Sequence, residues 1–256
     1  MPATRRNIVI TGAESGIGAA CAQAFGQIGD HVTVLYHSDA AAADVSVKAV
    51  RDAGGKAISL QCAIDDPASV DAAFAQMETQ VGAASVLVNS AGLNMSGVNV
   101  RDMPVATWTR LLGTDLTGAF LVSRRFLNGL GDVRPASIVH ISSIHAEAVR
   151  AGGADYCSAK GGLANLVRTL ALEEAPGGVR VNAVEPGMIL TPMNDRAEKD
   201  ETVRHAMEQH IPIGRAGRAD EVARLVRWLA SDEASYVTGA NIVIDGGLSL
   251  VQGVGA

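Results

Sequence analysis

The sequence is poor in cysteine, in aromatic residues and in clustered positive charge. Its three cysteines (Cys21, Cys62 and Cys157) are odd in number and far apart, which gives no metal-ligand spacing and favours a reducing cytoplasm. Aromatic residues are 4% of the chain, so few flat surfaces are available for a steroid or another polycyclic substrate. The net charge is −6 without a basic cluster, and a nucleic-acid partner is therefore not expected.

Long apolar runs are also missing. No run approaches the ~20 residues that a membrane-spanning helix needs, and the first apolar run is too short for a signal peptide. Apolar residues nevertheless make up 48% of the 256 residues, enough for a sizeable core. No Pro/Gly/Ser-rich linker or internal repeat divides the chain. We therefore expect one domain, residues 1–256, with a small-molecule partner and no membrane contact.

Short apolar runs alternate with helical patterns along the chain. The expected strands cover residues 7–11, 31–36, 56–61, 85–89, 137–142, 179–184 and 241–245. The first expected helix follows the strand at 7–11 and ends near residue 29. The other expected helices cover residues 40–53, 66–80, 104–130, 154–175, 193–209 and 219–230. This alternation predicts an α/β fold: a doubly wound parallel sheet of about seven strands, with helices on both faces. The segment at about 188–215 interrupts the alternation and is the expected substrate lid.

Tyr156 and Lys160 are four residues apart on an expected helix, so their side chains share one face. A free tyrosine, with a pKa of about 10, is a poor base at neutral pH, but a neighbouring lysine cation favours the phenolate. Ser143 follows an expected strand and could hold a substrate oxygen beside the phenol. Tyr-x-x-x-Lys alone also occurs in helices whose tyrosine is simply packed in the core. Other motifs must decide between these interpretations.

A glycine-rich turn lies directly between the first strand and the first helix. Gly12 suits an unusual backbone conformation, Gly16 allows a phosphate to approach the chain, and Gly18 allows close packing of helix on strand. The helix amides that follow would face a pyrophosphate. A plain tight turn is the alternative, but the flanking strand and helix favour dinucleotide binding.

The ordered set of motifs resembles the short-chain dehydrogenase/reductase family. It comprises Thr-Gly-x-x-x-Gly-x-Gly at 11–18, Asn89-Ser90-Ala91-Gly92, Ser143, Tyr156/Lys160, Pro186-Gly187 and Thr191. The resemblance covers essentially the whole chain and implies a Rossmann-type fold. Stretches at 142–147, 170–176 and 228–239 are most similar to bacterial glucose 1-dehydrogenases, although the last two also resemble 3-oxoacyl reductases.

The resemblance implies the roles of the site residues. Tyr156 would exchange a proton with the substrate oxygen, Ser143 would steady that oxygen, and Lys160 would assist the tyrosine and bind the nicotinamide ribose. Cofactor contacts are expected at Gly12, Glu14, Ser15, Gly16, Ile17, Gly18, Tyr36, His37, Ser38, Ala63, Ile64, Asn89, Ala91, Gly92, Tyr156, Lys160, Pro186, Gly187, Ile189 and Thr191. The resemblance also implies a homotetramer built through the helices at about 104–130 and 154–175.

The chain departs from the family pattern at two positions. The fourth catalytic residue of the family is an asparagine, and Asp115 stands in its place. Aspartate cannot donate an amide proton, and burial of its charge is costly. We still expect activity, because the backbone carbonyl could keep the family role. The second departure is Ala63, where an aspartate usually contacts adenine.

Cofactor choice is expected to be decided at the end of the second strand. Tyr36, His37 and Ser38 stand there, so no carboxylate excludes NADP, whereas Glu14 and Asp39 lie nearby and no arginine is present. The residues favour NADP with tolerance of NAD, and they suggest no metal site.

Residues after the catalytic serine and in the lid are expected to contact the substrate. These are Ser143, His145, Glu147, Asn94, Met188 and Met193, with Met95 beside them. The leading hypothesis is an NAD(P)-dependent oxidoreductase of alcohols and carbonyls, with a sugar such as glucose as the candidate substrate. A 3-oxoacyl-carrier-protein reductase is the alternative; it would predict a basic rim around the pocket, for which Arg124, Arg125 and Arg150 are the candidates. A catalytically silent dinucleotide sensor is the non-enzyme alternative.

Overall fold

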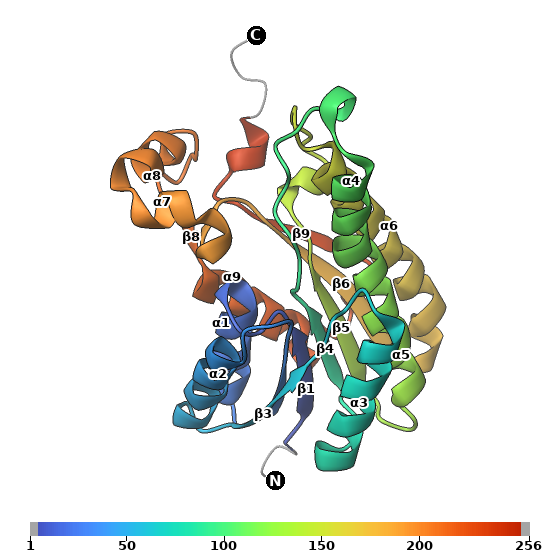
Figure 1. Cartoon of the computed structure of the whole chain (residues 1–256). Helices are drawn as coiled ribbons and strands as arrows, with labels where there is room; N and C mark the ends of the chain where they lie inside the picture. Colours follow the sequence, from blue (N-terminus) through green and yellow to red (C-terminus); the bar gives the residue numbers. More distant parts are fainter. Residues whose placement is uncertain (1–4, 252–256) are drawn as a thin grey trace.

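The computed structural model describes residues 5–251. These residues form a seven-stranded parallel sheet in the order β3-β2-β1-β4-β5-β6-β9 (Figure 1). Its strands are β1 (Asn7–Thr11), β2 (His31–Tyr36), β3 (Lys56–Gln61), β4 (Val86–Asn89), β5 (Ala136–Ile141), β6 (Val179–Pro186) and β9 (Asn241–Ile244). The parallel sheet and its seven strands are as predicted, and each boundary lies within two residues of its predicted position. The inner strands were predictable because they are buried on both faces and their apolar runs are nearly continuous, whereas the edge strands β3 and β9 are only partly buried.

Helices cover both faces of the sheet (Figure 1). One layer consists of α1 (Gly16–Gly26), α2 (Ala40–Asp52) and α9 (Ala219–Leu229). The other consists of α3 (Pro67–Val81), α4 (Val105–Leu112), α5 (Ala119–Gly129) and α6 (Ala154–Glu174). Side chains alternate along the strands, so that Ile8 and Ile10 pack under the first layer and Val9 under the second.

The long helix predicted at 104–130 is divided. Between α4 and α5 the chain forms a π-helical segment, η2 (Gly113–Gly118), which contains Asp115. π-Helical turns inside helices are rare and concentrate at functional sites. Here the wider turn lies beside the end of β4, where the Asp115 side chain reaches the β4 loop.

The helix predicted at 193–209 is likewise divided, into α7 (Asp195–Lys199) and α8 (Glu201–Glu208). Asp200 breaks it because its carboxylate accepts hydrogen bonds from the amides of Thr202 and Val203, so this residue caps α8 instead of continuing α7. The short strands β7 (Ile189–Leu190) and β8 (Gly217–Arg218) pair beneath these helices. The segment expected to be a lid, 188–215, thus contains β7, α7 and α8.

The strand order reverses at β1, which pairs with β2 on one side and β4 on the other. In doubly wound sheets the crevice beyond the carboxyl ends of the strands at such a point is where ligands bind. No helix among residues 5–251 is long and apolar enough to cross a membrane. All three cysteines are buried and unpaired with one another. The cytoplasmic location stays a prediction.

Candidate active site

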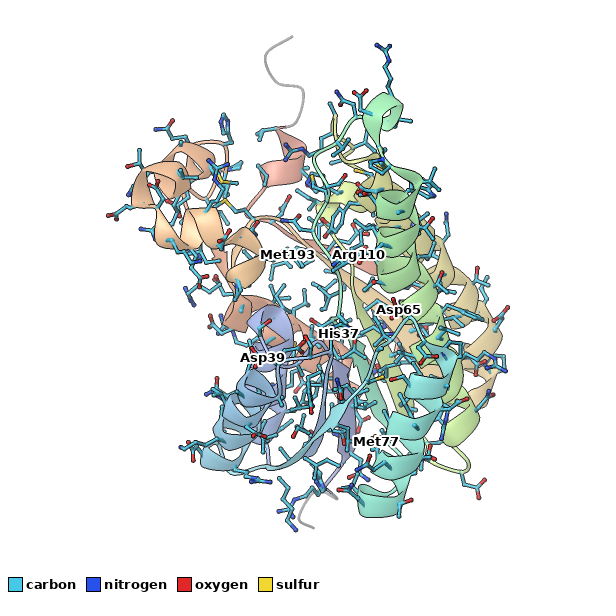
Figure 2. All side chains as sticks on the ribbon, in the orientation of Figure 1. His37, Asp39, Asp65, Met77, Arg110 and Met193 are labelled. Carbon is cyan, nitrogen blue, oxygen red and sulfur yellow. The ribbon has the colours of Figure 1, made fainter. Side chains whose placement is uncertain are left out.

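A cavity of about 930 Å³ lies at the carboxyl edge of the sheet. Its walls come from the turns after β1 to β6 together with the segment expected to be a lid. Figure 2 marks His37, Asp65, Arg110 and Met193, four residues of its lining. A cavity of this size is at the upper end of the range for small-molecule and cofactor sites.

Most of the predicted site residues line this one cavity. From the cofactor set these are Gly12, Glu14, Ser15, Gly16, Ile17, Tyr36, His37, Ile64, Ala91, Gly92, Tyr156, Lys160, Pro186, Gly187, Ile189 and Thr191. From the substrate set they are Ser143, His145, Asn94, Met188 and Met193. Residues far apart in sequence therefore meet because parallel strands present their carboxyl ends at one edge.

The glycine turn leaves no room for side chains. A Cβ on Gly12 would stand 2.7 Å from the Ala91 Cα, and one on Gly18 would stand 2.2 Å from the Gly12 carbonyl oxygen. Gly12 also has a φ of 63°, which glycine adopts at little cost. The first amides of α1 receive no side-chain cap from Ser15. Together with the dipole of α1, these free amides fit a phosphate group.

Glu14 occupies the far end of the cavity, beside the end of β2. Its Oε1 accepts a hydrogen bond of 3.4 Å from the His37 amide. Its Oε2 is buried and has no hydrogen-bond partner among residues 5–251. A buried carboxylate oxygen without a donor is costly, so this position fits a hydroxyl group of a bound molecule.

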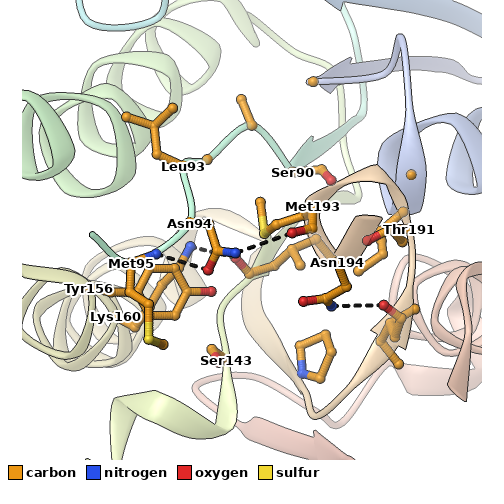
Figure 3. Close-up of a pocket in the computed structure, with 18 of the residues that line it drawn as sticks. Ser90, Leu93, Asn94, Met95, Ser143, Tyr156, Lys160, Thr191, Met193 and Asn194 are labelled. Carbon is orange, nitrogen blue, oxygen red and sulfur yellow. Dashed lines mark hydrogen bonds between the residues drawn. The ribbon is translucent and has the colours of Figure 1, made fainter. Parts of the chain in front are cut away.

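Tyr156, Lys160 and Ser143 come together at the other end of the cavity (Figure 3). Tyr156 and Lys160 lie one turn apart on α6, and the Lys160 Nζ is 5.3 Å from the centroid of the Tyr156 ring. Ser143 follows β5 and caps the short helix η3 (Ile144–Ala146), where its Oγ accepts from the His145 amide. All three side chains are largely buried, so the charge of Lys160 acts on the phenol with little screening by water.

Asp115 does not line the cavity and lies behind Lys160 instead. Its carboxylate is fully buried, with Oδ1 accepting from the Leu93 amide at 2.7 Å and Oδ2 standing 3.1 Å from the Lys160 Nζ. The distance makes an ion pair, although its angles fall short of a good hydrogen bond. Lys160 also donates to the Ile141 carbonyl at 3.3 Å. Burial favours a lower Lys160 pKa, but the nearby Asp115 and Tyr156 raise this pKa above its ordinary value.

Five other predicted site residues lie outside the cavity lining. Gly18 and Asn89 act beneath it: Gly18 packs on Gly12, and the Asn89 amide donates to the Ser123 hydroxyl at 3.1 Å. The Glu147 side chain is exposed, and its carboxylate lies 3.7 Å from the Arg168 guanidinium, outside the cavity lining. The remaining two residues are Ser38 and Ala63.

The substrate end combines apolar side chains with several polar ones. The Asn94 amide donates to the Met193 carbonyl at 3.2 Å and joins the β4 loop to the lid segment (Figure 3). Among the lining residues that the site predictions did not include are Leu93, Gly97, Arg110, Thr114, Ile144, Asn194, Met207, His210 and Leu248. Leu93, Thr114, Ile144 and Asn194 could have been found as sequence neighbours of predicted site residues, and Arg110 lies one turn before Thr114. Gly97, Met207, His210 and Leu248 carry no local signal, because only the fold brings them to the cavity.

Comparisons with known proteins agree with this geometry. The sequence profile described as enoyl-(acyl carrier protein) reductase, of the short-chain dehydrogenase type, matches residues 12–249. A 3β-hydroxysteroid dehydrogenase of Eggerthella lenta is 38% identical over 97% of this chain and 95% of that protein. Glucose 1-dehydrogenase 2 of Bacillus subtilis is 35% identical over 96% of each. A cis-4-hydroxycyclohexanecarboxylate dehydrogenase of Sinomonas cyclohexanicum is 38% identical over 96% of this chain and 97% of that protein.

A solved structure has the same fold. The short-chain type dehydrogenase/reductase of Mycobacterium marinum superposes with a TM-score of 0.85, at 33% identity, over 95% of this chain and 94% of that one. The family resemblance expected from the sequence motifs is thereby confirmed. By its family match and its relatives, the chain belongs to the short-chain dehydrogenase/reductase family and is an oxidoreductase that acts on CH–OH groups with a nicotinamide cofactor.

Proposed function

We propose that Tyr156, Ser143 and Lys160 carry the proton chemistry of a secondary alcohol/ketone oxidoreductase. The observation that carries this proposal is the convergence of the three side chains at one end of the cavity, with Lys160 held 5.3 Å from the phenol ring. The Tyr156 oxygen takes the hydroxyl proton of the alcohol and returns it in the reverse direction. Ser143 donates a hydrogen bond to the same substrate oxygen. Lys160 stabilises the phenolate electrostatically.

The cavity fits a nicotinamide dinucleotide along its length. The amides at the start of α1 would hold the pyrophosphate, Glu14 the adenosine ribose, and Pro186, Gly187 and Thr191 the nicotinamide side. When bound, the nicotinamide supplies or accepts the hydride. The protein's contribution is therefore to position both molecules and to manage one proton.

Glu14 supports NAD over NADP in this proposal. Its unpartnered Oε2 would accept a hydrogen bond from a ribose 2′-hydroxyl, whereas a 2′-phosphate would meet a like charge. No lysine or arginine from the β1 or β2 turns lines the cavity to offset that repulsion. The sequence alone favoured NADP, because no carboxylate stands at Tyr36, His37 or Ser38. The proposal for NAD rests instead on the hydrogen bond between the His37 amide and Glu14 at the end of β2.

The substrate end supports an apolar alicyclic alcohol with a distal anionic group. Methionine, leucine and isoleucine side chains line this end beside a few polar groups such as Asn94, Asn194 and His210, and no carboxylate side chain lines it. Arg150 also lines it, without a salt bridge to any residue of the described chain. A sugar carries more hydroxyls than these few polar groups can satisfy, so some would face the apolar side chains without partners. A cyclic hydroxycarboxylate, the kind of compound named for the Sinomonas relative, suits both the walls and the cation.

Two of the three arginines expected to form a basic rim for a 3-oxoacyl reductase do not line the cavity. Arg125 is bound to Glu78 by two hydrogen bonds of 2.8 and 2.7 Å, and Arg124 does not line the cavity. A carrier protein would then have only Arg150 from the predicted rim.

The test is turnover with NAD and NADP in parallel. Candidate substrates are cis-4-hydroxycyclohexanecarboxylate, cyclohexanol, a 3β-hydroxysteroid and glucose. We expect the highest kcat/KM with the hydroxycarboxylate and NAD. Tyr156→Phe should reduce kcat about 10²- to 10⁴-fold while dinucleotide binding persists, because only the proton transfer is lost. A higher kcat/KM with glucose would contradict the substrate proposal. Silence with every alcohol would support the sensor alternative.

We also propose that the 188–215 segment is a lid over the substrate end of the cavity. A second proposal is that the chain forms a homotetramer. Large apolar side chains are exposed on the outer helices, among them Val105 on α4, Phe120 on α5 and Leu172 on α6. Burial of such surface between subunits is favourable. Light scattering coupled to size exclusion would give the mass, and a monomer would contradict the assembly.

A further inference from the structure

Asp115 brings a negative charge into contact with the Lys160 ammonium, which a neutral asparagine side chain could not do. Its two oxygens have separate partners: Oδ1 binds the Leu93 amide, and Oδ2 stands 3.1 Å from the Lys160 Nζ. The carboxylate is 0% exposed and the lysine side chain 5%. A Cβ on Gly92 would stand 2.9 Å from Oδ2, so the glycine after β4 makes room for this carboxylate.

A buried ion pair of this kind changes what Lys160 presents to its other neighbours. A lone ammonium acts on Tyr156 as a full positive charge, whereas an ammonium paired with a carboxylate acts closer to a dipole. The same Lys160 Nζ faces the Tyr156 ring at 5.3 Å and Asp115 at 3.1 Å, and all three side chains are buried.

We propose that Asp115 is a positioning residue whose carboxylate holds Lys160 in place and partly cancels the positive charge that Lys160 presents to Tyr156. The consequence is that the phenolate is less stabilised than it would be with asparagine at this position. Alcohol oxidation, which needs the phenolate as base, is thereby shifted to higher pH. This inference rests on the roles proposed above for Tyr156 and Lys160.

Other charged or titratable groups near this pair come from the surrounding elements. His140 on β5 is fully buried, and its pKa is lowered to about 3 by burial and by Lys160, so it is neutral. The remaining groups are Asp155 and Cys157 on α6, His145 in η3, Arg110 on α4, Arg150 in the loop before α6, and His210 after α8. Both carboxylate oxygens of Asp155 accept from backbone amides, of Tyr156 and Ser96, and Asp155 forms no salt bridge with Lys160 among the described residues. Asp115 is thus the carboxylate paired with the lysine in the described structure.

The first experiment is the pH dependence of kcat/KM for alcohol oxidation in wild type and in the neutral variants Asp115→Asn and Asp115→Ser. We expect the acid limb to move about one pH unit lower in both, with up to about tenfold higher kcat/KM below the wild-type limb. Asp30→Asn is the matched control. It removes the buried carboxylate of a second ion pair, 2.8 Å from the partly exposed Arg6 that precedes β1 and away from the cavity, and should leave the limb in place.

The second experiment needs no turnover. The chain has three tyrosines, so ¹³Cζ-tyrosine NMR resolves each phenol, and Tyr156→Phe assigns the signal of Tyr156. Its titration should occur at lower pH in whichever neutral variant folds. An unmoved titration, an unmoved acid limb, or loss of oxidation at every pH in a folded variant overturns the proposal. A wild type silent with all alcohols would refute the proposed function alone, because the NMR titration still tests the pairing.

Discussion

At the scale of single residues, Glu14 is the side chain best placed to choose between the two nicotinamide dinucleotides. They differ only by a phosphate on the ribose 2′-oxygen, and this carboxylate is fixed beside the end of β2 by the His37 amide. One oxygen remains for a hydroxyl donor. In the proposal above, selection needs no arginine, because the carboxylate would accept a hydrogen bond from a 2′-hydroxyl and would repel a 2′-phosphate.

Glu14→Gln should therefore relax the preference for NAD. The amide keeps the size of the side chain but removes the charge that repels a 2′-phosphate. We expect the ratio of kcat/KM for NADP to that for NAD to rise about tenfold, which corresponds to ~1.4 kcal/mol. Asp39→Asn is the control, because Asp39 caps α2 and does not line the cavity. An unchanged ratio in Glu14→Gln would remove Glu14 from cofactor selection.

At the scale of elements, the cap at Asp200 determines where α8 begins and hence how Met207 reaches the cavity. Asp200→Ala should cost the short helix about 1 kcal/mol, the typical value of an N-cap. If the lid segment helps to bind substrate, KM for the alcohol should rise about fivefold, with little change in NAD affinity.

The matched control for the lid is Asp66→Ala. Asp66 caps α3 through the Ala68 amide, on a helix away from the lid. Its loss should lower overall stability by a similar amount without raising KM. Equal effects of the two variants on KM would show that global stability, and not the lid, is responsible.

The elements also show which features a sequence reveals. Strands such as Val86–Asn89 were predictable because burial on both faces leaves a continuous apolar run. The glycine turn and the Tyr156/Lys160 pair were predictable because their spacing is local. The break at Asp200 was not, because capping competed with helical periodicity there. The Asp115–Lys160 pair depends on α6 packing beside η2, which only the tertiary structure brings about.

At the scale of the whole molecule, the central sheet buries a histidine without a hydrogen-bond partner. Both ring nitrogens of His140 lack a partner within residues 5–251, and its side chain is 0% exposed. Burial, with the charge of Lys160, lowers its pKa from 6.5 to about 3. Between about pH 6.5 and pH 3, His140 is therefore protonated in the unfolded chain and neutral in the folded chain. The free energy of unfolding consequently falls as the pH drops towards 3.

This linkage predicts the acid sensitivity of the fold. Between pH 7 and pH 5 the free energy of unfolding should fall by about 2 kcal/mol, since 1.5 pH units below 6.5 are worth ~1.4 kcal/mol each. His140→Leu should remove that slope, because leucine binds no proton in either state. Urea unfolding of both proteins at the two pH values measures it, with His210→Leu as the exposed-histidine control. A slope that survives in His140→Leu would assign the acid sensitivity to other groups, since a neutral buried imidazole can contribute only through its own protonation.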